Sequence, residues 1–218
     1  MRLSSRLHVL RDLDGAAAPY RYEGIVRRAV LRAKYGNAPW AAVELGVEMS
    51  RLLFGAEIQM RGAEPTPLPV EGYAQGYQMI FPVPASGSRR GYNVPERMAQ
   101  PVAKTIGVPL RTDLLFRTHT DRKQEGLSLE ERLSNVANVF YVTRPEEVEN
   151  KRILLIDDVI TTGATVSACT RALLLAGAES VYAMSFATAE SAAPLPDTLA
   201  ASAEPPNDFD EEENDFPD

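Results

Sequence analysis

Apolar residues recur along the chain with two different periods, and these periods predict its secondary structure. Residues 23–36 show helical spacing, with Ile25, Ala29 and Ala33 on one face, and a second helix is predicted over residues 38–55. Short apolar runs predict strands at 78–84, 111–118, 138–143, 152–159 and 180–188, with helices at 94–106 and 165–176 between them. This alternation predicts an α/β fold with a mostly parallel sheet.

The remaining segments lack such a period. Residues 1–22 are expected to be irregular, and residues 61–77 are rich in proline and glycine, which predicts a loop or insertion. Asn93 and Glu96 have the spacing of a capping box at the start of the helix over 94–106. Residues 1–22 and 61–77 are therefore predicted to contain no helix or strand.

The most apolar strand ends in two adjacent acidic residues. The run "RILLIDDV", residues 152–159, is apolar on both faces, which is typical of a strand buried in a parallel sheet. Asp157 and Asp158 lie at its carboxyl end, where ligands of such sheets bind. Neighbouring carboxylates repel each other and are costly to bury. Their position therefore indicates a ligand that offsets this cost.

The loop "TTGAT", residues 161–165, connects the aspartates to the next helix. A glycine lets a ligand approach the backbone, threonine hydroxyls can donate hydrogen bonds, and a helix N-terminus attracts anions. The segment predicts a phosphate site beside carboxylates that suit the vicinal hydroxyls of a ribose. For either aspartate alone, the alternative is a carboxylate paired with an arginine. A P-loop ATPase is not supported, because the chain has no "GK" dipeptide.

Two polar loops and one helix concentrate positive charge. The loop "PASGSRRGYN", residues 84–93, offers backbone amides, hydroxyls and two arginines, and the loop "HTDRKQEG", residues 119–126, offers Arg122 and Lys123. The helix over 23–36 carries Arg27, Arg28, Arg32 and Lys34. Each group is either a solvated surface or a contact for a phosphate-rich ligand.

Composition and charge narrow the class of protein. The chain has 218 residues, 44% of them apolar, which predicts one domain with a true core. Its net charge of −7 arises in residues 189–218, which hold ten acidic residues and no lysine or arginine. That acidic, proline-rich tail is expected to be disordered. The longest apolar run of the chain, residues 172–178, is too short to span a membrane.

The string "ILLIDDVITTGAT", residues 153–165, resembles the phosphoribosyl-pyrophosphate (PRPP) signature of type I phosphoribosyltransferases. Three further stretches, "YEGIVRRAVLRAKYG", "PVPASGSRRGYN" and "DRKQEGLSLEERLSNVANVF", make residues 22–188 similar to the competence protein ComF (ComFC) family. The resemblance implies a type I phosphoribosyltransferase fold, a mostly parallel twisted sheet flanked by helices with a small N-terminal helical hood. Family members usually begin with a four-cysteine zinc module, which a chain with one cysteine, Cys169, cannot form.

The resemblance also implies residue roles. Asp157 and Asp158 would bind the ribose hydroxyls, and Arg122 or Lys123 would reach the leaving pyrophosphate from a loop that closes over PRPP. The 5′-phosphate would be held by Thr161, Thr162, Gly163, Ala164 and Thr165. The pyrophosphate would be held by Ala85, Ser86, Gly87, Ser88, Arg89 and Arg90. Magnesium (Mg²⁺) would be bound through PRPP oxygens and water rather than by protein ligands.

The resemblance implies a cytoplasmic protein that acts in DNA uptake for natural transformation together with the competence DNA-translocating helicase. The expected regions are an N-terminal helical hood (1–60), a Pro/Gly-rich loop (61–77), a PRPP-binding core (78–188) and the acidic tail (189–218). The expected reaction is transfer of a phosphoribosyl group with release of pyrophosphate. The alternatives are a non-catalytic PRPP-sensing or single-stranded-DNA-binding adaptor of the uptake machinery, and a nucleobase-salvage phosphoribosyltransferase.

Overall fold

The computed structural model describes residues 13–73, 76–85, 91–118 and 139–189. The helices within these residues are α1 (Gly24–Tyr35), α2 (Pro39–Phe54), α3 (Val94–Ile106), α5 (Pro145–Val148) and α6 (Ala164–Leu175). The strands are β1 (Gly15–Ala17), β2 (Tyr20–Arg21), β3 (Ile58–Arg61), β4 (Glu64–Pro67), β5 (Met79–Pro82), β6 (Leu115–Arg117), β7 (Phe140–Val142), β8 (Arg152–Ile160) and β9 (Ser180–Thr188). The predicted helices over 23–36, 38–55, 94–106 and 165–176 are confirmed within one or two residues.

The main sheet has the order β1-β9-β8-β5, with β2 also on β9, and its pairings in the described part of the chain are parallel. Strand β8 is central: it pairs with β9 as far as Ile160 and with β5 only as far as Ile156. A single parallel bridge between Ile80 and Leu110 continues the order beyond β5. The predicted α/β fold with a mostly parallel sheet is confirmed.

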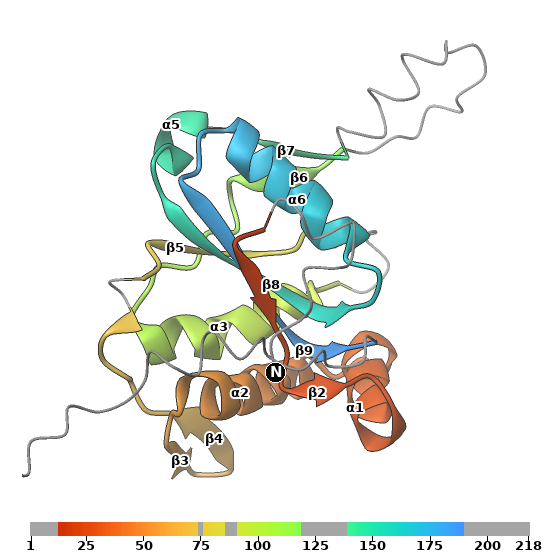
Figure 1. Ribbon diagram of the computed structural model, residues 1–218. Helices are drawn as coiled ribbons and strands as arrows, with labels where there is room; N and C mark the ends of the chain where they lie inside the picture. Colours follow the sequence, from red (N-terminus) through yellow and green to blue (C-terminus); the bar gives the residue numbers. More distant parts are fainter. Residues whose placement is uncertain (1–12, 74–75, 86–90, 119–138, 190–218) are drawn as a thin grey trace, which may run out of the picture.

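Alternate residues of β8 point to the two faces of the sheet, as expected for an extended strand. Ile153 and Leu155 belong to the cluster that includes α6, whereas Leu154 and Ile156 belong to the cluster that includes α1, α2 and α3. Figure 1 shows α6 on one side of the sheet and α2 and α3 on the other. Helices cover both faces of β8, which explains why its sequence is a continuous apolar run.

The N-terminal region is built into the main sheet. Strands β1 and β2 pair with β9, so the prediction that residues 1–22 are irregular is wrong for residues 15–17 and 20–21. These strands are only three and two residues long, too short to produce a visible period. Helix α1 buries Val30 and Ala33 in its second half, while Ile25, predicted on the apolar face, is 72% exposed in its first turn.

Two small antiparallel ribbons flank this sheet. Strands β3 and β4 form a hairpin, so the predicted loop over 61–77 contains a strand at Glu64–Pro67. Prolines at 65 and 67 concealed it, since proline usually argues against a strand except at an unpaired edge. Strand β6 pairs with β7, which shortens the predicted strand over 111–118 to Leu115–Arg117.

Helices α2 and α3 pack closely at a glycine. A Cβ atom added at Gly46 would lie 2.2 Å from the carbonyl oxygen of Met98 and 2.6 Å from Cγ of Pro101. Both residues belong to α3, the helix that follows β5 in the chain and borders the site described below. The backbones can therefore approach this closely only because residue 46 has no side chain.

We expect Gly46→Ala to lower the free energy of unfolding by about 1–3 kcal/mol, because an inserted methyl group must push the two helices apart. Urea unfolding followed by circular dichroism measures this. Gly76→Ala is the matched control, since its Cβ would meet only the Tyr73 carbonyl oxygen at 3.5 Å. Equal stability of the two variants would contradict the close contact.

Candidate active site

The two aspartates lie where β5 separates from β8. Both are buried, Asp157 at 9% and Asp158 at 7% exposed. Strand β5 stops pairing at Pro82, opposite Ile156, so beyond that point the β5 side of β8 has no neighbouring strand among the described residues. The predicted strand over 152–159 is confirmed, and β8 continues past the aspartates on β9 as far as Ile160. The partner strand ends instead, and this opens the sheet beside the carboxylates.

The connections that follow β5 and β8 lead away from this opening in opposite directions. Helix α3 leads from β5 to the bridge at Leu110 on the outer side, whereas α6 leads from β8 to β9 on the other. The order of strands thus reverses between β5 and β8. In parallel α/β sheets the crevice at such a reversal, at the carboxyl ends of the strands, is the usual ligand site.

A crevice of about 330 Å³ occupies this position. Its lining is mostly polar and combines both carboxylates with two cations, Lys34 from α1 and Arg117 from β6. The other lining residues are Tyr35, Val83, Pro84, Ala85, Asn93, Pro95, Val159 and Thr165. Residues from five separate stretches therefore converge on the carboxylate pair.

The two carboxylates have different partners. Asp157 accepts a hydrogen bond from the backbone N–H of Asp158 at 2.8 Å. Asp158 forms an ion pair with Lys34, with Nζ 2.7 Å from Oδ1. The side chain of Lys34 is 22% exposed, so this pair is better shielded from water than an ordinary surface pair. One carboxylate is therefore neutralised by a cation, and the other is stabilised by a single backbone amide.

Burial changes the acidity of Asp157. Its removal from water, followed by repulsion from Asp158, raises the pKa of Asp157 to about 7, and the Asp158 amide and Lys34 oppose this shift. The carboxyl group of Asp157 therefore changes its charge near neutral pH. A perturbed carboxylate in a polar crevice is typical of functional sites.

The loop after β8 leads into the N-terminus of α6. Gly163 has φ of 80°, a left-handed conformation that favours glycine, and it precedes the first residue of the helix. The first turn of α6 contains no acidic residue, and its N-cap residue Gly163 has no side chain to cap it. The N–H of Ala164 makes a long hydrogen bond of 3.4 Å to the hydroxyl oxygen of Thr162. Thr161, Thr162 and Thr165 are exposed around it, and residues 159–166 with Asp157 line a small hollow of about 30 Å³. Such a helix end can accept an anion through its free N–H groups.

The segment after β5 reaches the crevice from the opposite side. Asn93 precedes α3 but makes no capping hydrogen bond, so the predicted capping box with Glu96 is wrong. Its Nδ2 instead donates to the carbonyl oxygen of Val83 at 3.0 Å, which joins the two ends of the intervening loop. Ala85, a predicted pyrophosphate contact, lines the crevice. Ser86, Gly87, Ser88, Arg89 and Arg90 lie outside the described residues.

Other predicted residues also lie outside the described part of the chain. They are the catalytic candidates Arg122 and Lys123, and the acidic tail from residue 190 onward. Among the described residues no group of three or more histidine, cysteine or acidic side chains could hold a metal ion. Two carboxylates, one already paired with Lys34, fit Mg²⁺ that arrives with phosphate oxygens and water.

A family comparison agrees with this geometry. The model of the phosphoribosyl transferase domain matches residues 89–218, more than half of the chain, including both aspartates and the loop after them. The chain belongs to the phosphoribosyl transferase domain family. The predicted type I phosphoribosyltransferase fold is thereby confirmed, together with the sheet order found above.

Curated relatives support the predicted resemblance to the ComF family. The chain is 28% identical to competence protein F of Haemophilus influenzae over 73% of its own length and 66% of that protein. It is 30% identical to DNA utilization protein YhgH of Salmonella typhi over 63% of its length and 58% of that protein. The chain therefore spans less than two thirds of each of these relatives.

Two solved structures also resemble the chain, each with 19% sequence identity. The allosteric regulatory enzyme of purine biosynthesis matches with a TM-score of 0.42 over 68% of this chain and 25% of that one. Glutamine PRPP amidotransferase from B. subtilis, complexed with ADP and GMP, matches with a TM-score of 0.43 over 67% of this chain and 26% of that one.

Sequence analysis did not identify Lys34, Tyr35 and Arg117 individually as residues that line the crevice. Lys34 was one of four cations on a predicted helix, and only it lines the crevice. Tyr35 follows it and is 69% exposed, and Arg117 arrives from β6. Helical spacing shows which side chains share a face but not which face meets another element, so no signal in the sequence separates Lys34 from its neighbours.

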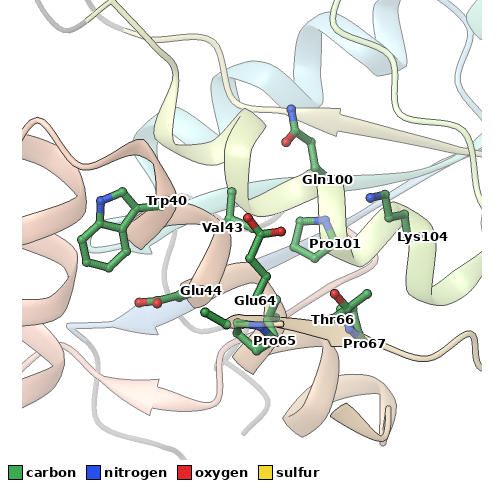
Figure 2. A pocket seen from close by; sticks show the side chains of 12 residues that line it. Trp40, Val43, Glu44, Glu64, Pro65, Thr66, Pro67, Gln100, Pro101 and Lys104 are labelled. Carbon is green, nitrogen blue, oxygen red and sulfur yellow. The ribbon is translucent and has the colours of Figure 1, made fainter. Parts of the chain in front are cut away.

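A larger cavity of about 410 Å³ lies between α2, α3 and the β3–β4 hairpin (Figure 2). Apolar side chains such as Val43 and Pro101 line it, with Trp40 at one end and Lys104 at the other. Its lining includes neither aspartate nor the N-terminus of α6. The smaller crevice is therefore the candidate active site, because it holds the groups able to bind a phosphorylated sugar. Among the described residues, no helix is long and apolar enough to cross a membrane.

We expect Asp157→Asn to raise the free energy of unfolding above that of the wild type, and to do so more at pH 8 than at pH 5. The pKa of Asp157 is raised in the folded state, so the native protein binds an extra proton between about pH 4 and pH 7. Stability from this group is present at low pH and is lost as pH rises through the folded pKa. Asparagine cannot ionise and keeps an oxygen for the Asp158 amide, so the variant avoids the loss of about 3 kcal/mol in unfolding free energy that the wild type undergoes between pH 5 and pH 8.

Thermal unfolding at pH 5 and pH 8 measures this difference. Asp113→Asn is the control, because Asp113 is exposed and its hydrogen bonds with Arg111 hold its pKa below the usual range. That variant should gain no stability at pH 8. If Asp157→Asn shifted the melting temperature equally at both pH values, Asp157 would titrate like an ordinary exposed carboxyl.

Proposed function

We propose that the protein binds PRPP with Mg²⁺ in the crevice between β5 and β8. The carboxylates of Asp157 and Asp158 would accept hydrogen bonds from the two ribose hydroxyls. The 5′-phosphate would bind the N–H groups and hydroxyls of residues 161–165, and the pyrophosphate would extend toward the loop that follows β5. The observation that carries this proposal is a buried carboxylate pair beside a helix N-terminus whose N-cap residue is glycine, where the strand order reverses.

The groups of the crevice suit glycosyl transfer at C1 of PRPP. The acceptor would attack C1, the bond from C1 to the pyrophosphate oxygen would break, and its electron pair would leave with the pyrophosphate. Positive charge develops on the ribose in such a reaction, and ionised carboxylates beneath it would stabilise that charge. Lys34 and Arg117 lie within the same crevice and would offset the negative charge of the phosphates. Bound Mg²⁺ would supply further neutralisation of the pyrophosphate.

The printed names of the relatives suggest the process in which this chemistry would act. Competence protein F and DNA utilization protein YhgH are named for the uptake or use of DNA. We extend this to the present chain as a role in DNA uptake for natural transformation, in the cytoplasm and alongside the competence helicase.

Calorimetric titration with PRPP and Mg²⁺ tests the binding step. We expect the wild type to bind and the double variant Asp157→Asn/Asp158→Asn to lose at least about tenfold in affinity, because amides replace charged hydrogen-bond acceptors. Asp113→Asn is again the control for a distant carboxylate. A wild-type protein that releases no heat and shows no thermal shift with PRPP would remove the proposal. Release of pyrophosphate with nucleobase acceptors would then separate an enzyme from a sensor.

A second candidate function is binding of single-stranded DNA, and one observation favours it. Tyr35 is 69% exposed and Trp40 is 50% exposed beside the cationic helix α1. The Arg32 guanidinium carbon lies 4.4 Å from the centroid of the Trp40 ring. Exposed aromatic rings next to arginines are the usual platform on which unpaired bases stack.

Fluorescence titration with oligothymidylate tests this alternative, because Trp40 is the only tryptophan in the chain. We expect quenching on binding, an affinity that falls steeply with salt, and a loss of about 1–3 kcal/mol in Tyr35→Ala from lost stacking. Tyr141→Ala is the matched control, since Tyr141 is also exposed but lies on β7. Affinity that does not change with salt would argue against phosphate contacts and against the adaptor.

A further inference from the structure

Lys34 differs from the other cations of α1 in its surroundings. Arg27, Arg28 and Arg32 are exposed on the helix, whereas Lys34 is partly buried and points its ammonium group at Asp158. Lys34 also lies outside the residues matched by the family model, which begin at 89. The N-terminal region thus contributes a charged group to a crevice that is otherwise built mainly by the family domain.

The end of α1 is fixed in place by the segment that follows β5. The hydroxyl of Tyr92 donates a hydrogen bond of 2.6 Å to the carbonyl oxygen of Ala33, the residue before Lys34. Ala33 is fully buried. Asn93, the residue after Tyr92, donates a hydrogen bond to the carbonyl oxygen of Val83. These contacts hold the backbone of Lys34 next to the loop that begins at residues 83–85. A long side chain on a fixed backbone loses less freedom when it binds a ligand.

The location of Lys34 shows which part of a ligand it can reach. Lys34 lines the larger crevice together with Val83, Pro84 and Ala85, at the start of the loop after β5. The small hollow formed by residues 159–166 includes Asp157 but neither Lys34 nor Asp158. Lys34 therefore lies with the β5 segment in the larger crevice and outside the small hollow at the start of α6, while Thr165 lines both.

The ammonium group of Lys34 has hydrogen-bond donors that the contact with Asp158 does not use. It carries three N–H bonds, and one contact to Asp158 leaves the others for a second acceptor. Lys34 and Arg117 also balance the two aspartates, so a negatively charged ligand meets a crevice without excess negative charge. Loss of Lys34 would leave Asp158 unpaired and make the crevice repel phosphate.

We propose that Lys34 is a pyrophosphate-binding residue, which shares its ammonium group between Asp158 and a phosphate oxygen of the ligand on the β5 side. This inference rests on the proposed function and adds to it a residue from the N-terminal helix. The competing explanation is that Lys34 only orients Asp158. In that case its loss would affect every ligand that uses the ribose hydroxyls, with or without a pyrophosphate group.

Three probes separate these explanations by calorimetry in the presence of Mg²⁺: PRPP, inorganic pyrophosphate and ribose 5-phosphate. We expect Lys34→Met to weaken PRPP and pyrophosphate by at least about tenfold, and ribose 5-phosphate by less than about threefold. Lys34→Arg should restore much of the pyrophosphate affinity because it restores the charge. Arg27→Met is the matched control, because it removes one positive charge from the same helix outside the crevice.

The possible outcomes distinguish this inference from the function on which it rests. If the wild type binds none of the three probes, the proposed function is wrong and the inference fails with it. If the wild type binds PRPP and Lys34→Met binds pyrophosphate equally well, only the inference is wrong. An equal loss for ribose 5-phosphate and PRPP would also overturn it, in favour of a role in orienting Asp158. Thermal unfolding of each variant verifies that the comparison is between folded proteins.

Discussion

The organisation of the site depends on the cost of burying two adjacent carboxylates. Asp157 and Asp158 lie on the central strand, each less than 10% exposed, in a sheet covered by helices on both faces. Burial and mutual repulsion favour the neutral form of a carboxyl group, which is why the pKa of Asp157 rises. The fold accommodates the pair because β5 ends beside Ile156, which provides room for a crevice, and because Lys34 supplies a compensating charge.

The compensating charge comes from a distant part of the sequence. More than a hundred residues separate Lys34 from Asp158, and α1 reaches the crevice because β1 and β2 anchor the N-terminal region to β9. The backbone N–H of Tyr22 also donates to the carbonyl oxygen of Thr188 at the end of β9, close to the start of α1. The short N-terminal strands therefore have a role beyond extending the sheet: they set the position of the helix that neutralises the site.

The sequence predicted the parts of this site that are contiguous. Residues 153–165 contain a buried strand, two carboxylates and a helix start in one string, and each of these follows from local properties of the residues. The contribution of Lys34 could not be predicted in the same way, because it depends on how α1 packs against the sheet. Strands β1, β2 and β4 were missed for a related reason. Their two to four residues are specified by pairing with distant partners rather than by their own period.

A comparison of this crevice with the cavity beside Trp40 illustrates why chemistry and not size identifies the candidate active site. The cavity beside Trp40 is larger and more apolar, as many ligand sites are. Its lining, however, comes mainly from α2, β4 and α3, and it includes neither buried aspartate nor the strand reversal beside them. The crevice at Asp157 and Asp158 combines buried charge, a helix N-terminus that begins at a glycine and the open edge of a central strand. Such costly features together are typical of functional sites, and the phosphorylated ribose proposed above would supply both hydroxyl donors and an anion to this combination.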